Sequence, residues 1–228
     1  MAAGKIKWIY LFILSLIWGS SFILIKKGLI GLSPLQVGAF RVIFAALFLI
    51  LAGFKKIINL KVSQWKWIVV SGFVGSFFPI FLFSFAETKI SSGIASILNA
   101  VTPLMTLVLG VLFFQDKMNG NKAIGVFVGL IGTAGLILSN ASFNGSENYL
   151  YSLLGVLAAV CYAVNVNLLK RYLNDISALA VTAGCFTVLL VPALLILVWS
   201  GFFNENLSNI QLQQSVGFIA ILGVLGTG

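Results

Sequence analysis

Seven apolar stretches, each long enough to cross a lipid bilayer as a helix, constrain this chain more than any other feature of its sequence. A helix needs about 20 mainly apolar residues to cross the hydrocarbon core of a bilayer. An eighth stretch begins at Val216 and runs to Gly228. The pattern predicts an all-α protein that crosses the membrane many times. The seven stretches are Trp8–Ile25, Leu35–Gly53, Trp67–Phe85, Ile94–Phe114, Ala123–Leu138, Tyr149–Leu169 and Ala178–Trp199.

The composition excludes several other classes of protein. Only 8% of the residues are charged and 60% are hydrophobic, whereas about 25% are charged in an average soluble domain. The net charge is +9, but the basic residues separate the apolar stretches instead of forming one basic face. We therefore expect the lipid bilayer as a partner and no nucleic acid.

The sequence also offers few residues suited to catalysis or metal binding. The chain has no histidine and two cysteines, Cys161 and Cys185, both inside apolar stretches, where cysteine commonly acts as a small packing residue. None of the five acidic residues lies in the middle of a predicted span. We expect no enzyme active site, no metal and no cofactor. Proton antiport through a carboxylate inside a span, as in small multidrug transporters, is not supported either.

The basic residues also predict the orientation of the chain, because cytoplasmic loops carry an excess of Lys and Arg. Lys26, Lys27 and Lys89 lie on one side, and Arg41 lies within the second span. The other side, which includes the N-terminus and is therefore expected to be cytoplasmic, carries ten basic residues: Lys5, Lys7, Lys55, Lys56, Lys61, Lys66, Lys117, Lys122, Lys170 and Arg171.

An internal repeat becomes visible when the sequence is compared with itself at an offset of 144 residues. At an offset of 151, Gly72 and Gly75 fall on Gly223 and Gly226. The 144-residue offset places Trp18, Leu24, Lys26, Leu29, Ser33, Leu35, Val37 and Ala39 on Tyr162, Leu168, Lys170, Leu173, Ser177, Leu179, Val181 and Ala183.

Five predicted spans precede the second copy, so the two copies would enter the membrane from opposite sides. Inverted repeats of this kind are a recurring plan in secondary transporters. We expect a first five-helix repeat over residues 1–139 and a second over residues 149–228. Completing the second repeat to give ten spans would take about sixty further residues.

Three segments resemble the drug/metabolite transporter superfamily, and specifically its EamA-type branch: Trp18–Leu29 (WGSSFILIKKGL), Ser33–Leu47 (SPLQVGAFRVIFAAL) and Ser92–Leu138. The sequence departs mildly where this family has Gly-Glu after the fourth span, since Gln115 and Asp116 stand there. The resemblance implies a secondary transporter with an inverted five-plus-five helix fold, located in a prokaryotic cell membrane. It also implies export of amino acids or similar small amphipathic metabolites by alternating access.

Polar side chains in the fourth span form the first candidate substrate site. Asn99, Thr102 and Thr106 fall on one side of a helix. Pro103 has no N–H, so it leaves the carbonyl of Asn99 without its helical partner. Broken helices of this kind contact substrates where they line a cavity, and the resemblance places this span at the central cavity. Alternatively, these side chains only hydrogen-bond a neighbouring helix.

The first and sixth spans supply the second candidate group. Trp18 and Ser21 are three residues apart, as are their repeat counterparts Tyr162 and Asn165. Each pair combines an aromatic ring with a hydrogen-bonding neighbour, which suits a small amphipathic ligand. The alternative is ordinary helix packing.

Small residues and prolines mark expected packing and hinge positions. Gly72, Gly75 and Pro79 lie in the third span, where small residues allow close helix approach and proline allows a bend. Pro103 is the matching feature of the fourth span. Glycines at 125, 129 and 132 predict packing of the fifth span, with contact in a homodimer as a lesser possibility. Arg41 either has a structural role or meets an anionic group.

Two other functions remain open at this level. An organic-phosphate or nucleotide-sugar carrier is the first, although such a carrier should show paired basic residues in its cavity and only Arg41 is visible. A membrane scaffold or sensor without transport activity is the second.

Overall fold

The computed structural model describes residues 2–114 and 146–227, together with 120, 124–125, 127–129 and 131–132. Every element bounded in this part of the chain is a helix, which confirms the all-α prediction. The elements are α1 (Ala2–Gly28), α2 (Pro34–Ile57), α3 (Val62–Gly72), η1 (Phe73–Phe77), α4 (Phe78–Ala86), α5 (Ser92–Asn99), α6 (Thr102–Phe114), α8 (Ser146–Tyr172), α9 (Ala178–Trp199), η2 (Phe202–Asn204), α10 (Ile210–Ile221) and η3 (Leu222–Thr227).

Seven helical segments of the described part are long and apolar enough to cross a membrane. Six of them match predicted spans, and the predicted span Ala123–Leu138 lies largely outside the described residues. The segment predicted to begin at Val216 instead begins at Ile210. Its first turn is polar in sequence, but the side chain of Asn209 accepts a hydrogen bond from the backbone N–H of Gln211 and starts the helix there. The ten-span arrangement stays a prediction.

Two serines explain where α2 and α9 begin. Ser33 caps α2 and Ser177 caps α9, each accepting a hydrogen bond from a backbone N–H in the first turn. These serines are 144 residues apart, the offset of the internal repeat. At Ser33, Gln36 bonds back to the cap and completes a capping box.

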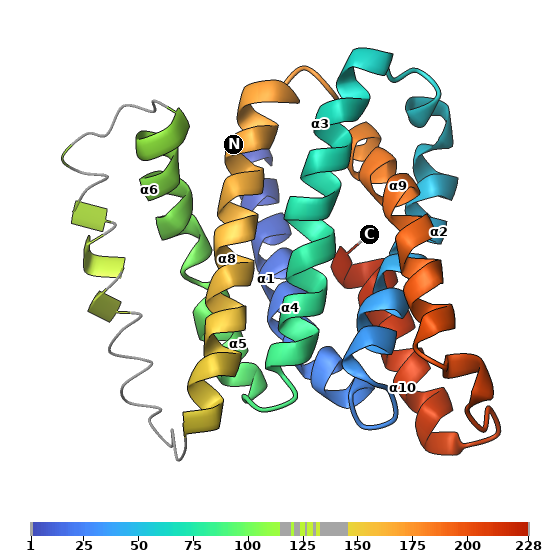
Figure 1. The fold of residues 1–228 in the computed structure, drawn as a ribbon. Helices are drawn as coiled ribbons and strands as arrows, with labels where there is room; N and C mark the ends of the chain where they lie inside the picture. Colours follow the sequence, from blue (N-terminus) through green and yellow to red (C-terminus); the bar gives the residue numbers. More distant parts are fainter. Residues whose placement is uncertain are drawn as a thin grey trace.

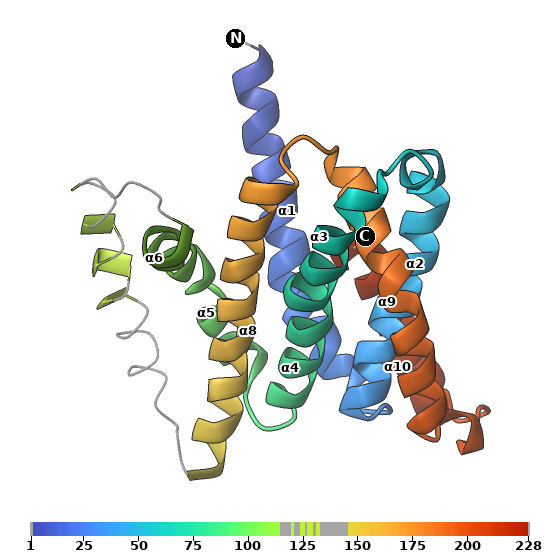
Figure 2. The same cartoon turned by 45° about the horizontal axis from the view of Figure 1, so that its top comes forward.

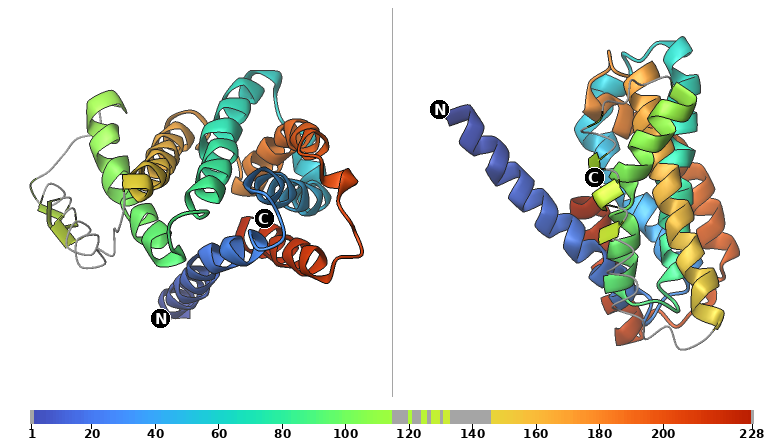
Figure 3. Two further views of the ribbon diagram at one scale, coloured as in Figure 1. Left: turned by 60° about the horizontal axis from the view of Figure 1, so that its bottom comes forward. Right: turned by 90° about the vertical axis from the view of Figure 1, so that its left-hand side faces the viewer.

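The closely packed pair α2 and α9 forms the right-hand side of the bundle in Figure 1. Gly53 permits this approach, because a Cβ there would lie 2.6 Å from the Cβ of Ala183. The segment α3–η1–α4 lies between this pair and α8, while α5 and α6 pack on α8. The chain then returns through α10 and η3, whose end lies in the middle of the bundle (Figure 3, left).

α1 packs against the bundle only along its second half. Phe22 and Ile25 enter the core, whereas the residues from Trp8 to Leu14 are apolar and exposed. The N-terminal end of α1 projects away from the other helices (Figure 2 and Figure 3, right). An apolar, exposed helix surface is what a lipid environment requires.

Three irregular segments interrupt the spans. The fourth span breaks between Asn99 and Thr102, directly before Pro103, as the missing N–H of this proline predicts. The π-helix η1 precedes Pro79 in the third span, and the backbone N–H of Phe78 bonds to the carbonyl of Phe73, five residues back. The second π-helix, η3, contains Gly223 and Gly226, the counterparts of Gly72 and Gly75.

Candidate functional site

Asn165 on α8 meets the π-helical part of the third span. The hydroxyl of Ser71 donates to Oδ1 of Asn165 at 2.6 Å. A Cβ added at Gly75 would overlap the Asn165 amide, so only glycine leaves room for this side chain. The structure therefore brings two predicted residues, Asn165 and Gly75, into direct contact.

Ser21 on α1 meets the second π-helix in the corresponding way. A Cβ added at Gly226 would lie 2.9 Å from the hydroxyl oxygen of Ser21. Ser21 and Asn165 are 144 residues apart, and Gly75 and Gly226 are 151 apart. The same helix contact is thus made at positions that the internal repeat relates. Ser21 is only 7% exposed and donates to the carbonyl of Ile17 in its own helix.

The other repeated glycines show the same relation. A Cβ added at Gly72 would lie 3.3 Å from the Cβ of Cys185, and one added at Gly223 would lie 3.0 Å from the carbonyl of Arg41. Arg41 and Cys185 are also 144 residues apart. The boundary between the proposed repeats, near residues 139–149, lies mostly outside the described residues and stays a prediction.

Arg41 is buried near the middle of the bundle. Its Nε donates to the hydroxyl of Thr227 at 2.8 Å, which ties α2 to η3. Tyr162 and Glu87 lie near Arg41. The hydrogen bond to Thr227 holds the buried side chain of α2 against η3.

Tyr162 lies in a row of aromatic rings that crosses the bundle. Its ring stacks against Phe83 of α4, with 6.3 Å between the ring centroids. Phe83 meets Phe22 of α1 edge-on, with 5.2 Å between the ring centroids. Pro79 is buried in the same helix as Phe83. Trp18 is not part of this row, because its side chain is 57% exposed on α1. The structure therefore does not bring Trp18 together with its counterpart Tyr162.

The fourth-span residues lie at the break between α5 and α6. The hydroxyl of Thr102 is 3.5 Å from Oδ1 of Asn99, a weak contact, and the hydroxyl of Thr106 donates to the carbonyl of Thr102 at 2.8 Å. The amide of Asn167 on α8 donates to the carbonyl of Thr106 at 3.0 Å. Asn167, which was not a predicted site residue, thus joins α8 to α6. Pro103 is exposed beside the break.

Glu87 is the second residue that the sequence analysis did not place in a site. It follows α4 in the turn between two spans, yet its side chain is 0% exposed. Its Oε2 lies 3.0 Å from the hydroxyl oxygen of Ser92, and its Oε1 is the buried side-chain oxygen or nitrogen that lacks a hydrogen-bond partner within the described residues. Burial raises the pKa of Glu87 to about 8, against the opposing effects of Ser92, Lys26 and Arg41. A residue at a span end gave no sequence signal of burial.

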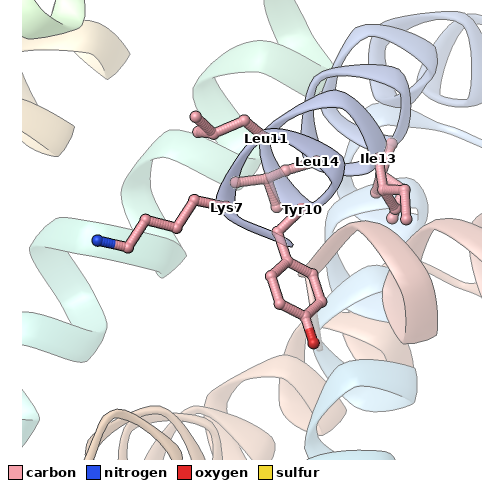
Figure 4. A pocket seen from close by; sticks show the side chains of 6 residues that line it. Lys7, Tyr10, Leu11, Ile13 and Leu14 are labelled. Carbon is pink, nitrogen blue, oxygen red and sulfur yellow. The ribbon is translucent and has the colours of Figure 1, made fainter. Parts of the chain in front are cut away.

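Of two surface hollows, one shares a single residue, Asn167, with these polar contacts. The larger, of about 490 Å³, runs along the exposed side of α1 (Figure 4). It is lined only by residues of that helix, including Lys7 and Tyr10. The other, of about 210 Å³, is lined by Phe114, Asn167, Lys170 and Arg171. Among the described residues, no cluster of three or more potential metal ligands is present.

Packing accounts for one of the fifth-span glycines. A Cβ added at Gly129 would lie 2.7 Å from Cδ2 of Leu104 on α6, whereas Gly125 and Gly132 face open space. Gly129 thus packs within the chain, and a homodimer contact stays a prediction.

Comparison with known protein families gives one family. The model described as the EamA-like transporter family matches residues 6–138. An uncharacterized transporter of Archaeoglobus fulgidus is 27% identical over 97% of this chain and 76% of its own length. A protein of Escherichia coli named "probable amino-acid metabolite efflux pump" is 24% identical over 92% of this chain and 68% of its own length.

A solved crystal structure has the same fold. It superposes with a TM-score of 0.63 and 19% sequence identity, covering 95% of this chain and 74% of that one. At this level of identity the likeness concerns the fold alone.

Proposed function

Because the chain belongs to the EamA-like transporter family, and is therefore an integral membrane transporter, we propose that it exports amino acids or similar small amphipathic metabolites. The proposal places the N-terminus in the cytoplasm of a prokaryotic cell, as the distribution of Lys and Arg predicts. Export is supported by the name of the Escherichia coli relative, which describes an efflux pump.

The observation that carries the proposed substrate class is the pair of asparagines on α8, which lie two residues apart and therefore on opposite sides of the helix. Asn165 meets the π-helix η1, and Asn167 meets the broken fourth span. Irregular backbone and amide side chains offer both donors and acceptors inside the membrane, which a zwitterion with an ammonium and a carboxylate group requires. The ring of Tyr162 on the same helix supplies apolar area for the rest of the solute.

In this proposal the solute contacts Asn99, Thr102 and Thr106 from the fourth span, Tyr162 and Asn165 from α8, and Trp18 and Ser21 from α1. Alternating access would move these elements relative to one another. Gly72, Gly75, Pro79 and Pro103 are proposed to permit that motion, because they lie at or beside the irregular segments. Trp18 joins the site only in a state in which α1 closes on the bundle, since its ring is exposed in this structure.

The test is solute counterflow in proteoliposomes that contain the full chain. The probes are labelled amino acids of different side-chain class, with glucose 6-phosphate as a phosphate-bearing alternative. We expect uptake of at least one amino acid, and a loss of more than tenfold in the Asn99→Ala/Tyr162→Phe double variant. The matched control is Trp199→Ala, which removes an aromatic ring that is 82% exposed.

Selective counterflow of glucose 6-phosphate would replace the proposed substrate class with an organic phosphate. Amino-acid counterflow that is unchanged in the double variant would keep the exporter and move its site. Absence of flux for every probe, from protein shown to be folded, would contradict the proposed substrates.

A further inference from the structure

Glu87 and Ser92 form a hydrogen-bond chain with α1 that has one hydrogen too few when Glu87 is ionised. The Ser92 hydroxyl oxygen lies 3.0 Å from Oε2 of Glu87 and 3.1 Å from the carbonyl oxygen of Phe22. A hydroxyl has a single hydrogen, so it cannot donate to both oxygens at once. If Glu87 carries a proton, its O–H donates to Ser92, and Ser92 donates to Phe22.

The position of Lys26 agrees with a neutral carboxyl group. Its Nζ donates to the main-chain carbonyls of Glu87 and Ile90 at 2.6 and 3.1 Å. The side-chain oxygen Oε1 of Glu87 is fully buried and has no hydrogen-bond partner among the residues that the structure describes. An unpaired buried oxygen costs far less in a neutral acid than in a carboxylate.

We propose that Glu87 is the proton-binding site of this transporter and that its protonation controls the attachment of α1 to the turn before α5. This proposal rests on the proposed transport function, to which it adds the coupling ion. Glu87 releases its proton to water at the membrane surface, and only its O–H bond is broken. The Ser92 hydroxyl then turns from Phe22 to the new carboxylate, and Lys26 is drawn from the main-chain carbonyls toward it.

This change acts on a helix that carries proposed binding residues. Phe22 directly follows Ser21 on α1, and Lys26 lies four residues further along. Loosening the link at Phe22 therefore frees the segment that has to move if Trp18 is to enter the site. Proton release and α1 movement then belong to one equilibrium in which each favours the other, as coupling requires.

Three basic residues lie around Glu87. Lys26 on α1 and Arg41 on α2 interact with it electrostatically, and Lys89 lies in the same turn. α8 faces Arg41 with Tyr162. Burial, which opposes ionisation, is the largest influence on Glu87, so ionisation has to accompany entry of water or a shift of Lys26.

The first test detects the proton directly and needs no transported solute. Infrared difference spectra of the full chain in liposomes are recorded between pH 5 and pH 10 for the wild type and Glu87→Gln. We expect the C=O band of a protonated carboxyl that disappears at alkaline pH and is missing in Glu87→Gln. Ser92→Ala should shift this band, because the carboxyl loses its partner, and the exposed-residue control Glu205→Gln should leave it unchanged. A wild type without such a band at neutral pH would overturn the proposal.

The second test follows α1. Spin labels at the exposed positions Ile23 and Ser96, in a Cys161→Ala/Cys185→Ala background, report the distance between α1 and α5. We expect the distance to change over the pH range in which the infrared band disappears, and to stay at its low-pH value in Glu87→Gln. A pH response that persists in Glu87→Gln would overturn the proposal.

Counterflow of the amino acid identified above then tests coupling. An imposed pH gradient should stimulate flux severalfold in the wild type but not in Glu87→Gln, in which α1 stays attached and flux should be low with or without the gradient. Wild-type flux that ignores the gradient would overturn the coupling role. Absence of any flux in the wild type would instead contradict the proposed function. The infrared and distance measurements would still decide whether Glu87 binds the proton.

Discussion

α1 and α8 occupy corresponding positions in the internal repeat, but they pack differently. Each has 27 residues, and α8 begins and ends 144 residues after α1. α8 packs against α4, η1, α5 and α6, whereas α1 contacts α5, α10 and η3 with its second half. The corresponding contacts at Ser21 and Asn165 are alike, but one helix is held along its length and the other only near its end. The difference predicts that equivalent substitutions will have unequal effects.

The largest expected effect concerns the end at which α1 is held. The folded state keeps the proton of Glu87 up to a pKa of about 8, while an unperturbed carboxyl loses it near 4.5. The free energy of unfolding should therefore fall as the pH rises from about 4.5 to 8, by at most about 1.4 kcal/mol for each pH unit. Chemical unfolding in detergent, followed by circular dichroism, measures this slope.

Glu87→Gln should remove this part of the pH dependence, because an amide does not titrate. Glu205→Gln is the matched control, since Glu205 is exposed. An equal slope in wild type and Glu87→Gln would mean that other groups cause the dependence.

The second prediction compares the paired aromatic residues. Tyr162→Ala should lower the free energy of unfolding by about 2–3 kcal/mol, because the ring packs on Phe83 in the core. Trp18→Ala should cost less than about 1 kcal/mol, because its ring is mostly exposed. Equal losses would show that α1 is packed as tightly as α8.

The third prediction compares the paired glycines. Gly75→Ala should cost about 1–3 kcal/mol, because the new methyl group overlaps the Asn165 amide and displaces it from Ser71. Gly226→Ala should cost less, since the Ser21 hydroxyl can rotate away. Thermal unfolding in detergent ranks the two variants.

Removing the obstructing side chain tests this explanation. In the Gly75→Ala/Asn165→Ala double variant, the loss should be smaller than the sum of the two single losses. Strict additivity would mean that the methyl group at position 75 acts through something other than Asn165.

The smallest expected difference lies in the hydrogen bonds of the paired polar residues. Asn165→Ala deprives the Ser71 hydroxyl of its acceptor and should cost about 1 kcal/mol. Ser21→Ala removes only a bond within α1 to Ile17, so a change of a few tenths of a kcal/mol is expected. Chemical unfolding of both variants under one condition measures the difference, and a larger loss for Ser21→Ala would reverse the comparison.

Much of the fold could be predicted because membrane spans are marked by composition alone. The fourth-span break was also predictable, since Pro103 removes a helical hydrogen bond regardless of its surroundings. The start of the last span was wrong by six residues, because its first turn is polar and Asn209, not hydropathy, begins the helix. The contacts of Ser71, Asn167 and Thr227 could not be predicted, since each partner comes from a helix distant in sequence.

The sequence by itself determined six of the spans, the repeated serines Ser33 and Ser177 that begin two helices, and the family. These properties depend on local hydropathy, on single residues at helix starts, and on similarity along the chain. Only the tertiary structure decided that Glu87 is buried, that Asn165 lies on Gly75, and that Trp18 remains outside. Burial and contact depend on which helix faces come together, and the hydropathy of a helix that is apolar all round does not specify those faces.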